Sequence, residues 1–383
     1  MTVVSFSDDA DKAMAAGDIR RARILLAQQT KLAPTLETWL KLGSMCRADG
    51  DFQAALASIE KALAIAPLDF MALLSRASLL ERLAVPEFGE AYGRALAQRP
   101  SGALSPTIER MLAHAELSHT QHIEARSARL SRAVSPALKM ATASEAKRIA
   151  RYQSNVLRKT RTYHSEPTHF HFPGLVEQEF YDPADFGWFE AFAAHTDTIA
   201  AEFAVVASAS RAELVPYVQY SDHEPLDQWR DLNNSSDWTA IHLLQNGLSI
   251  EANAKHCPTT MALLNAVPQP KIAGCSPNAM FSLLAPRTTI PPHHGVSNTR
   301  LVCHLPLIIP EGCWFRVGAE TRMWERGQAL VFDDTIEHEA CNPSNALRVV
   351  LIFDVWHPDL SETEQGAVRL LMEADANEAA LAL

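Results

Sequence analysis

The sequence predicts an α+β protein of two domains, with a helical region first and a small β-domain after it. Three observations support this fold class. The first hundred or so residues repeat with a period of 33 residues, and at Pro167 the composition becomes aromatic and rich in turns. Between Pro291 and His357, short apolar β-type runs alternate with Gly, Pro and Asn turns and carry several histidines. At 383 residues, the chain is long enough to bury two cores.

Helical repeats are expected over residues 1–115. The motif Gly17-Asp18-Ile19 matches Gly50-Asp51-Phe52, and Ala33-Pro34 matches Ala66-Pro67, each at an offset of 33 residues. Large, small and proline positions then follow in the order of the tetratricopeptide pattern, which this region resembles. These positions are Trp39, Leu42, Gly43, Ala55, Ile59, Ala62 and Pro67.

Two interpretations of the repeats stay open. A short solenoid would bind a protein partner or mediate self-association, whereas a helical cap would support the next domain or a dimer interface. The second copy fits the pattern less well, because Tyr92, Ala95 and Pro100 align only after a one-residue deletion. In addition, Phe88 stands where a small residue is expected.

Residues 116–165 are predicted to form a helical linker. This stretch lacks the 33-residue register and is the basic part of an acidic protein. A solvated helix face is the ordinary explanation, and a contact surface for an acidic partner is the alternative. The basic residues are Arg126, Arg129, Arg132, Lys139, Lys147, Arg148, Arg151, Arg158, Lys159 and Arg161.

The composition argues against several classes of function and location. A formal net charge of −11 is unlike that of a nucleic-acid binder. No apolar run approaches the roughly 18 residues of a membrane-spanning helix, and the first residues lack a secretory-signal pattern. The six cysteines form no CxxC pair, which favours free thiols in a reducing compartment. We therefore expect a cytoplasmic protein without a membrane span.

The β-domain is predicted over residues 166–383. On its strand over 300–309, alternation places Arg300, Val302 and His304 on one face. A helix is expected over 186–207, followed by a polar loop over 219–238 with the length of a binding lid and a short helix over 257–264. Strands are expected over 279–285, 300–309, 313–317, 328–333 and 347–355. A final helix is expected to begin at a capping box at 361–364 and to run to the C-terminus.

Histidines carried by separate strands suggest a metal site in this domain. His293 and His338 lie 45 residues apart, each beside a strand and a turn, and His304 lies on a strand between them. A single histidine is more often structural than a ligand, but the coincidence of several favours a site for a redox-active iron. Arg348, ten residues after His338, is suited to bind a dicarboxylate through its planar fork. An internal ion pair is the alternative for this arginine.

The chain from Pro167 to Leu360 resembles the aspartyl/asparaginyl β-hydroxylase family of iron(II)- and 2-oxoglutarate-dependent oxygenases. The resemblance rests on the segments FSLLAPRTTIPPHHGVSNTRLVCHLPL, CWFRVGAETRMWERGQALVFDDTIEHEACN and RVVLIFDVWHP. It implies a double-stranded β-helix (jelly-roll or cupin-like) with flanking helices, the cofactor Fe(II), and the co-substrates 2-oxoglutarate and O₂. The implied reaction hydroxylates an unactivated C–H bond of an amino-acid-like, peptide or other small substrate and releases succinate and carbon dioxide.

The resemblance also implies a role for each matching residue. His293 and His338 correspond to the two iron ligands. Gly295 stands where other such oxygenases carry a third, carboxylate ligand, and the family does without that ligand. No separate catalytic side chain is implied. The residues that correspond to the co-substrate site are Ser282 and Arg348 for the distal carboxylate, His304 near the metal-binding end and Trp238 in the pocket wall.

Several positions depart from the family pattern. Val302 stands where relatives carry a second co-substrate arginine, and Arg300, one pleat away on the same face, is expected to substitute for it. Arg287 replaces a turn glycine, and Asn233 replaces an arginine that binds substrate in the animal enzyme. Two alternatives to an active hydroxylase stay open: a partner-binding repeat protein with a degenerate, non-catalytic oxygenase domain, and a cupin-type metalloenzyme of another reaction class.

Overall fold

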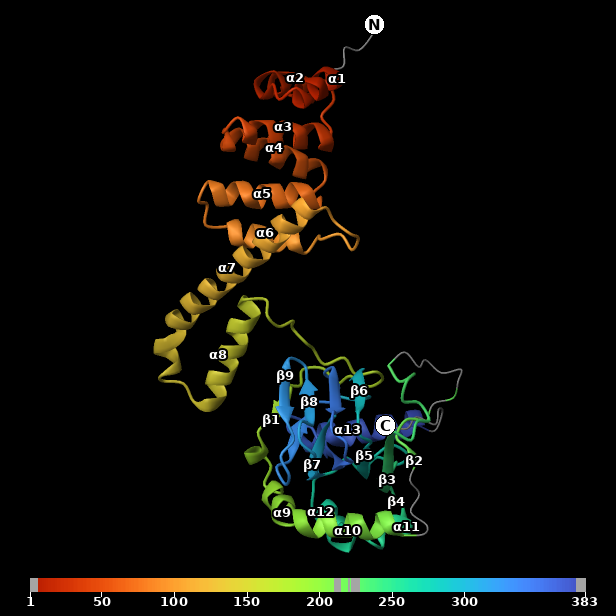
Figure 1. Ribbon diagram of the computed structural model, residues 1–383. Coiled ribbons are helices and arrows are strands. Elements are labelled where there is room, and N and C mark those ends of the chain that lie inside the picture. The colour runs from red at the N-terminus through yellow and green to blue at the C-terminus, as the bar shows by residue number, and fades with distance from the viewer. Residues whose placement is uncertain (1–5, 210–214, 220, 222–227, 377–383) are drawn as a thin grey trace. The chain divides into compact units, whose positions relative to one another are not determined.

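The computed structural model describes residues 6–209, 215–219, 221 and 228–376 (Figure 1). The chain divides into two compact units, Met1–Lys159 and Thr160–Leu383. The predicted boundary at 115/116 falls inside a continuous helix of the first unit, and the predicted boundary at 165/166 lies a few residues into the second.

The first unit is helical, and its helices stack in consecutive pairs (Figure 1). The 33-residue period has a structural cause. Asp18 and Asp51 each cap the second helix of a pair, accepting hydrogen bonds from the backbone N–H groups of Arg21 and Ala54. The prediction of tetratricopeptide-like helix pairs is confirmed. The helices are α1 Ser7–Ala15, α2 Ile19–Leu32, α3 Leu36–Ala48, α4 Phe52–Ile65, α5 Phe70–Arg82, α6 Phe88–Leu96, α7 Pro106–Leu138 and α8 Ala143–Val156.

Small residues let these helices approach closely. A Cβ added at Gly43 of α3 would lie 2.8 Å from the end of the Ile59 side chain on α4. Where α6 meets α7, a Cβ at Gly89 would lie 2.2 Å from the Cβ of His122, and His119 hydrogen-bonds through Nδ1 to the Gly89 carbonyl at 2.9 Å. The histidines of the predicted linker thus serve helix packing.

The second unit contains two antiparallel sheets, an arrangement consistent with a β-sandwich. The larger sheet has the strand order β1-β10-β7-β12-β5-β3-β2, with β4 paired to β3, and the smaller has the order β6-β11-β8-β9. The strands are β1 Phe180–Tyr181, β2 Val215–Pro216, β3 Trp238–Gln245, β4 Leu248–Ser249, β5 Ala279–Leu284, β6 Thr288–His293, β7 Arg300–Ile308, β8 Trp314–Val317, β9 Glu320–Met323, β10 Leu330–Phe332, β11 His338–Asn342 and β12 Arg348–Trp356.

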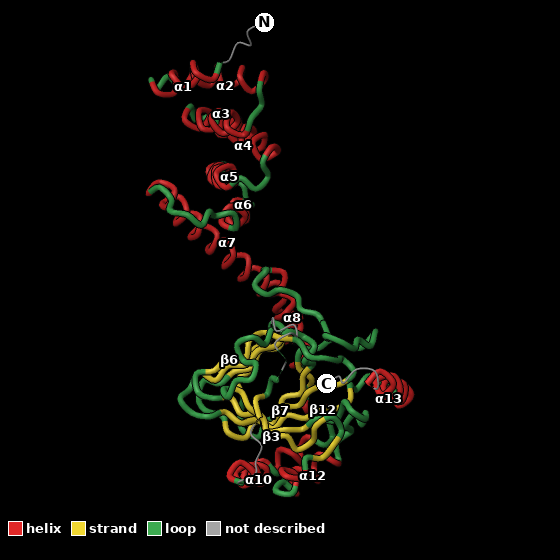
Figure 2. The backbone as a smooth tube through the Cα atoms, turned by 90° about the vertical axis from the view of Figure 1, so that its right-hand side faces the viewer, coloured by secondary structure: helices red, strands yellow, loops and turns green. Residues whose placement is uncertain are grey.

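The two faces of the larger sheet belong to different cores. One face packs against α10 and α12, which run along that side of the sheet (Figure 2). The other face packs against the smaller sheet, as Val302 and Val350 do with Phe315. The predicted alternation on β7 is confirmed, because Leu301 and Cys303 lie in the first core and Val302 in the second. Side chains of the Val302 face therefore point between the sheets. The helices of this unit are η1 Pro183–Asp185, α9 Phe189–Ala194, α10 Thr196–Ser208, α11 Glu251–Ala254, α12 Pro258–Asn265 and α13 Glu362–Ala376.

The five expected strands are present, each within a few residues of its predicted bounds. Four longer strands, β3, β6, β9 and β11, escaped prediction. Two prolines made β6 look like a turn, but β6 is an edge strand, where proline is tolerated. The helix expected over 186–207 is two helices, α9 and α10, which meet at His195. Of the predicted lid and final helix, residues 220, 222–227 and 377–383 lie outside the described residues.

Within the described parts of the chain, no helix is both long enough and apolar enough to cross a membrane.

Candidate functional site

Two imidazoles meet where strands β6 and β11 pair. His293 ends β6, His338 begins β11, and the two residues are register partners. Their ring centroids lie 3.9 Å apart, and both side chains are buried. The ladder is irregular just after His338, between His338 and Ala340, so the pair stands at the end of the regular pairing. The structure thus brings together the two histidines that were predicted to act together.

The backbone fixes the protonation form of both rings. Nδ1 of His293 lies 2.7 Å from the Pro291 carbonyl, and Nδ1 of His338 lies 3.0 Å from the Ile336 carbonyl. Burial, reinforced by the neighbouring His338, holds the pKa of His293 well below its usual value. Burial also lowers the pKa of His338 to about 4. A neutral ring that donates from Nδ1 keeps its Nε2 lone pair free, which is the form that binds a metal.

Gly295 cannot carry a third ligand in this fold. A Cβ at this position would lie 2.2 Å from Oδ2 of Asp334, so a side chain at 295 would require Asp334 to move. Among the described residues, no cluster of three or more His, Cys, Asp or Glu side chains is arranged to hold a metal ion. The pair His293 and His338 fits a metal centre with two protein ligands and several open positions.

Arg348 is a buried cation for which the described residues supply no counterion. Its side chain is 1 % exposed, and its Nη1 donates to the carbonyl and the Oγ of Ser282, both at 3.3 Å. It forms no ion pair with any residue that the structure describes. Burial lowers its pKa to about 10. Because an uncompensated buried charge is costly, this position fits a bound anion, and the alternative of an internal ion pair has no partner among the described residues.

Further polar groups around Arg348 also lack partners. Trp238 donates from Nε1 to Ser282 Oγ at 2.9 Å, and since Arg348 donates to the same oxygen, the Ser282 hydroxyl proton is free for a ligand. Nδ1 of His304, Nε1 of Trp324 and Nε of Arg348 are buried and have no hydrogen-bond partner among the described residues. The guanidinium of Arg348 lies 4.9 Å from the centroid of the Trp324 ring. These orphaned groups fit a small ligand rich in acceptor oxygens.

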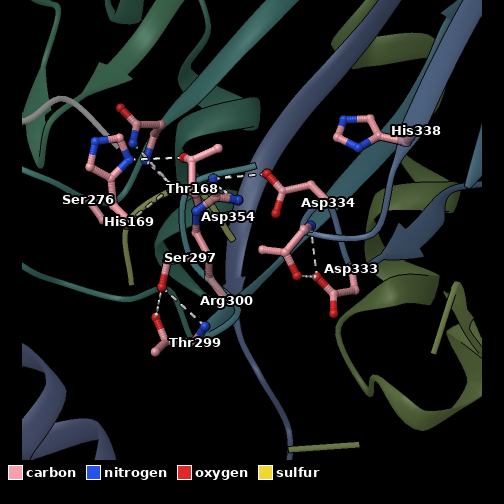
Figure 3. A network of polar contacts seen from close by, with 12 residues as sticks. Thr168, His169, Ser276, Ser297, Thr299, Arg300, Asp333, Asp334, His338 and Asp354 are labelled. Atoms are coloured by element: carbon pink, nitrogen blue, oxygen red, sulfur yellow. Dashed lines mark hydrogen bonds and ion pairs between the residues drawn. The ribbon is translucent and has the colours of Figure 1, made fainter. Parts of the chain in front are cut away.

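Arg300 is buried between two carboxylates (Figure 3). Its Nη2 lies 3.1 Å from Oδ2 of Asp334, and its Nη1 lies 3.6 Å from Oδ1 of Asp354. Burial works to lower its pKa, but the two carboxylates outweigh burial and raise that pKa above the usual value. Arg300 therefore differs from Arg348 in having its charge matched within the protein. Its part in co-substrate binding stays a prediction.

Aromatic side chains wall the histidine pair on the larger-sheet side. The ring of Trp229 lies 4.4 Å from that of His293, and Tyr217 stacks on Trp238 at 3.8 Å with nearly parallel planes. Neither Tyr217 nor Trp324 was predicted as a site residue. Their positions depend on contacts between distant segments, so the only available sequence signal was an aromatic residue near a predicted loop or strand.

His294 and Arg287 are accounted for locally. The imidazole of His294 lies 3.8 Å from the Glu166 carboxylate. Arg287 lies in the turn between β5 and β6 with a φ of 59°, the left-handed conformation that a glycine adopts without strain. Its Nε donates to Asn345 at 2.9 Å, which holds it in the turn.

The β-unit thus contains two neutral imidazoles and a buried arginine that forms no ion pair with a described residue. Residues 193–358 match the family model described as aspartyl/asparaginyl beta-hydroxylase, and this range contains every site residue named above. The predicted resemblance to that family is confirmed for this part of the chain.

Three relatives illustrate the match. Aspartyl/asparaginyl beta-hydroxylase of Mus musculus is 39% identical over 142 residues, which are 37% of this chain and 19% of that protein. Aspartate beta-hydroxylase domain-containing protein 2 of Homo sapiens is 36% identical over 137 residues, 35% of this chain and 37% of that protein. Ornithine lipid ester-linked acyl 2-hydroxylase of Rhizobium tropici is 34% identical over 186 residues, 46% of this chain and 60% of that protein. The match thus spans about a fifth of the mouse protein.

Solved structures similar to the chain match its helical part. The type III secretion chaperone SycD of Yersinia enterocolitica, in complex with a peptide of the translocator YopD, is 13% identical with a TM-score of 0.28. That likeness covers 32% of this chain and 92% of the chaperone chain. The Sgt2 TPR domain of Aspergillus fumigatus is 20% identical with a TM-score of 0.26, over 29% of this chain and 74% of that one.

Proposed function

We propose that the β-unit is an iron(II)- and 2-oxoglutarate-dependent hydroxylase, and that its two sheets form a double-stranded β-helix. The observation that carries the proposal is the pairing of two neutral imidazoles, His293 and His338, with the buried and unpaired cation of Arg348. The pair suits a metal, and the arginine suits the distal carboxylate of a dicarboxylate. The hydroxylase relatives support the same class of reaction.

His293 and His338 would hold the iron through Nε2, because Nδ1 of each ring is committed to a backbone carbonyl. When bound, iron(II) would supply the activation of O₂ that hydroxylation of an unactivated C–H bond requires. Gly295 and its close approach to Asp334 leave a coordination position without a protein ligand. The chain itself fixes the rings, keeps them neutral and leaves room for other ligands.

Arg348 and Ser282 would bind the distal carboxylate of 2-oxoglutarate, with Ser282 donating its free hydroxyl proton. His304, whose pKa is held well below its usual value by burial and by Arg348, would add a neutral donor. Trp238 would line the pocket and hold Ser282 in position. The negative charge of the bound carboxylate would then compensate the positive charge of Arg348. This compensation is the energetic reason for 2-oxoglutarate to bind at a buried position.

We propose that Arg300 helps to shape the co-substrate site but does not neutralise the charge of the co-substrate, because Asp334 and Asp354 already match its own charge. Trp229 beside His293 would limit water at the metal side. A C–H hydroxylation of this type needs no side-chain general base, so no further catalytic residue is proposed.

The substrate is proposed to be amino-acid-like, a peptide or another small molecule, met in the cytoplasm. Val302, buried between the sheets, offers no charge to the co-substrate at the position where relatives carry an arginine, and it does not define the substrate. The Rhizobium tropici relative is named for acting on the acyl chain of a lipid. The helical repeats are proposed to bind a protein or peptide partner or to mediate self-association.

The test is turnover of the full-length protein, prepared anaerobically with iron(II) and then supplied with 2-oxoglutarate and O₂. We expect a visible metal-to-ligand charge-transfer band and formation of succinate. His338→Ala should abolish both. The matched control is His294→Ala, because that imidazole is adjacent in sequence but lies toward Glu166. Neither a band nor succinate with the unaltered protein would overturn the hydroxylase, as would full activity in His338→Ala.

A further inference from the structure

An extended segment, residues 161–172, connects the two histidine-bearing loops and lies before the region matched by the family model. We call it the strap. At its start, Tyr163 packs against the core between the sheets and under the guanidinium groups of Arg161 and Arg316, at 4.3 and 5.6 Å. At its end, Phe170 and Phe172 pack on a separate small core. That core contains Ile272, Cys275, Val368 and Met372.

The first half of the strap binds the loop that leads into His338. The Ser165 hydroxyl lies 2.6 Å from that of Thr335, and the Glu166 N–H donates to the Thr335 carbonyl at 2.8 Å. Arg161 pairs with Glu337, the residue before His338, at 2.6 Å. The strap thus contacts this loop through main chain and side chain within three residues of the histidine.

The second half of the strap binds the loop that leaves His293. Thr168 donates its N–H to the Gly295 carbonyl at 2.9 Å, and Phe170 donates to the Val296 carbonyl at 3.0 Å. The buried Asn298 side chain then pairs with both backbone groups of Phe172, accepting from its N–H at 2.7 Å and donating to its carbonyl at 2.9 Å. Figure 3 shows Thr168 and His169 of the strap, whose side chains hydrogen-bond to each other at 2.9 Å.

Loops outside a regular ladder open more easily than strands, and a metal site requires its ligands to be held within a fraction of an ångström. Both histidines stand at strand ends, and the Gly295 N–H to Asp334 carbonyl bond of 2.7 Å joins their loops directly. The strap adds a row of hydrogen bonds on the outer side of both loops at once. One continuous piece of backbone therefore ties together segments about 40 residues apart.

We propose that the strap is a positioning element that fixes the relative position of His293 and His338. The proposal deepens the proposed function and rests on it, since the position matters for a metal held by these two residues. It assigns a role to residues that the family model does not include. Asn298, in the loop that leaves His293, is the strap's main anchor on that loop, because this one side chain satisfies both backbone groups of Phe172.

The experiment uses full-length variants Asn298→Ala, Asn298→Asp and Ser165→Ala. The Asp variant keeps the acceptor for the Phe172 N–H but loses the donor to its carbonyl, so it should fall between the unaltered protein and Asn298→Ala. Asp359→Asn is the matched control, since Asp359 accepts from the Val176 N–H, just beyond the strap, and its carboxylate forms no hydrogen bond or ion pair with a described residue of either loop. Circular dichroism at the working temperature confirms that each variant is folded.

Two readouts are compared: the affinity for Co²⁺, followed by its visible absorption without turnover, and amide hydrogen exchange over 293–299 and 333–339. Loss of an outer contact to a metal ligand typically weakens metal binding about 10- to 100-fold. We expect a weakening of this size in Asn298→Ala, a smaller one in Asn298→Asp and none in the control, with faster exchange in both loops of the strap variants.

The outcomes separate the two proposals. Unaltered Co²⁺ affinity and unaltered exchange in folded Asn298→Ala and Ser165→Ala would overturn the strap. Absence of metal binding in the unaltered protein would overturn the iron site, and the exchange data would then decide alone whether the strap holds the loops. Faster exchange in only one loop would also contradict the proposal, because the strap is proposed to act on both.

Discussion

The two units of this protein hold their structures by contacts of different range. In the helical unit, neighbouring helices in sequence are neighbours in space, so the period of 33 residues appears both in the helix caps and in the buried core residues. In the β-unit, His293 meets His338 and Arg348 meets Ser282 across the fold. The comparison teaches that a regular local period locates a repeat, whereas a site made of distant residues depends on the register of the whole sheet.

The sharpest test of the long-range contacts is Arg348. Arg348→Ala and Arg348→Lys should both raise KM for 2-oxoglutarate by on the order of 100-fold, because removing one partner of a buried charge pair leaves the other unmatched and a lysine lacks the planar fork. Succinate formation over a range of 2-oxoglutarate concentrations measures the change. Arg326→Ala, at a half-exposed pair with Asp197, should leave KM unchanged. An unchanged KM in Arg348→Ala would remove the basis of the anion site.

The corresponding test of the local contacts lies in the helical unit. Gly89→Ala places a Cβ 2.2 Å from that of His122, and overpacking of this kind costs about 1–3 kcal/mol of stability. Gly102→Ala is the matched control, because nothing lies within 4 Å of its added Cβ. Chemical unfolding of each variant gives the change, and metal affinity should stay at the level of the unaltered protein. Equal stability of the two variants would show that the α6–α7 crossing is loose.

The pH dependence of stability tests the histidine pair. In the unfolded chain the pKa of His338 is about 6.5. In the folded protein burial of the ring lowers this pKa to about 4. Between these values the unfolded state binds more protons, so stability should fall as the pH is lowered from 6.5 to 4. The loss is of the order of 1–3 kcal/mol and should shrink in metal-free His338→Gln.

Asp333 acts in the opposite direction in an overlapping window. Burial raises its pKa to about 6, so its carboxyl favours the folded state at low pH and loses that contribution as the pH rises toward 6. The comparison of the unaltered protein with His338→Gln, both without metal, isolates the histidine contribution. Parallel stability curves for these two proteins would contradict the assignment of a buried neutral imidazole.

Sequence patterns could predict those features that depend on nearby residues. The caps at Asp18 and Asp51 and the alternation that turns Val302 and His304 toward one face are local properties. Likewise, the coincidence of histidines between turns pointed to His293 and His338 before their register was known.

The features that escaped prediction depend on three-dimensional contacts. Trp324 acquires its place beside Arg348 only when β9 and the following turn close over the sheet. The contact of Ser165 with Thr335 joins residues 170 positions apart. Neither periodicity nor spacing in the sequence indicates which distant residues come into contact. For the same reason, the sequence could not show that Asp334 and Asp354 match the charge of Arg300.

The smallest effect is expected at Arg287, a locally determined turn inside the β-unit. Its φ of 59° costs about 1–2 kcal/mol for an ordinary residue, least for asparagine and most for a β-branched one. Arg287→Gly relieves this strain but makes the unfolded chain more flexible by about 0.4–1 kcal/mol, so the two effects nearly cancel. Thermal unfolding should therefore rank the variants Asn at or above Gly, and both above Val. If the Val variant is the most stable of the three, residue 287 does not hold the left-handed conformation, and the geometry of this turn depends on its surroundings.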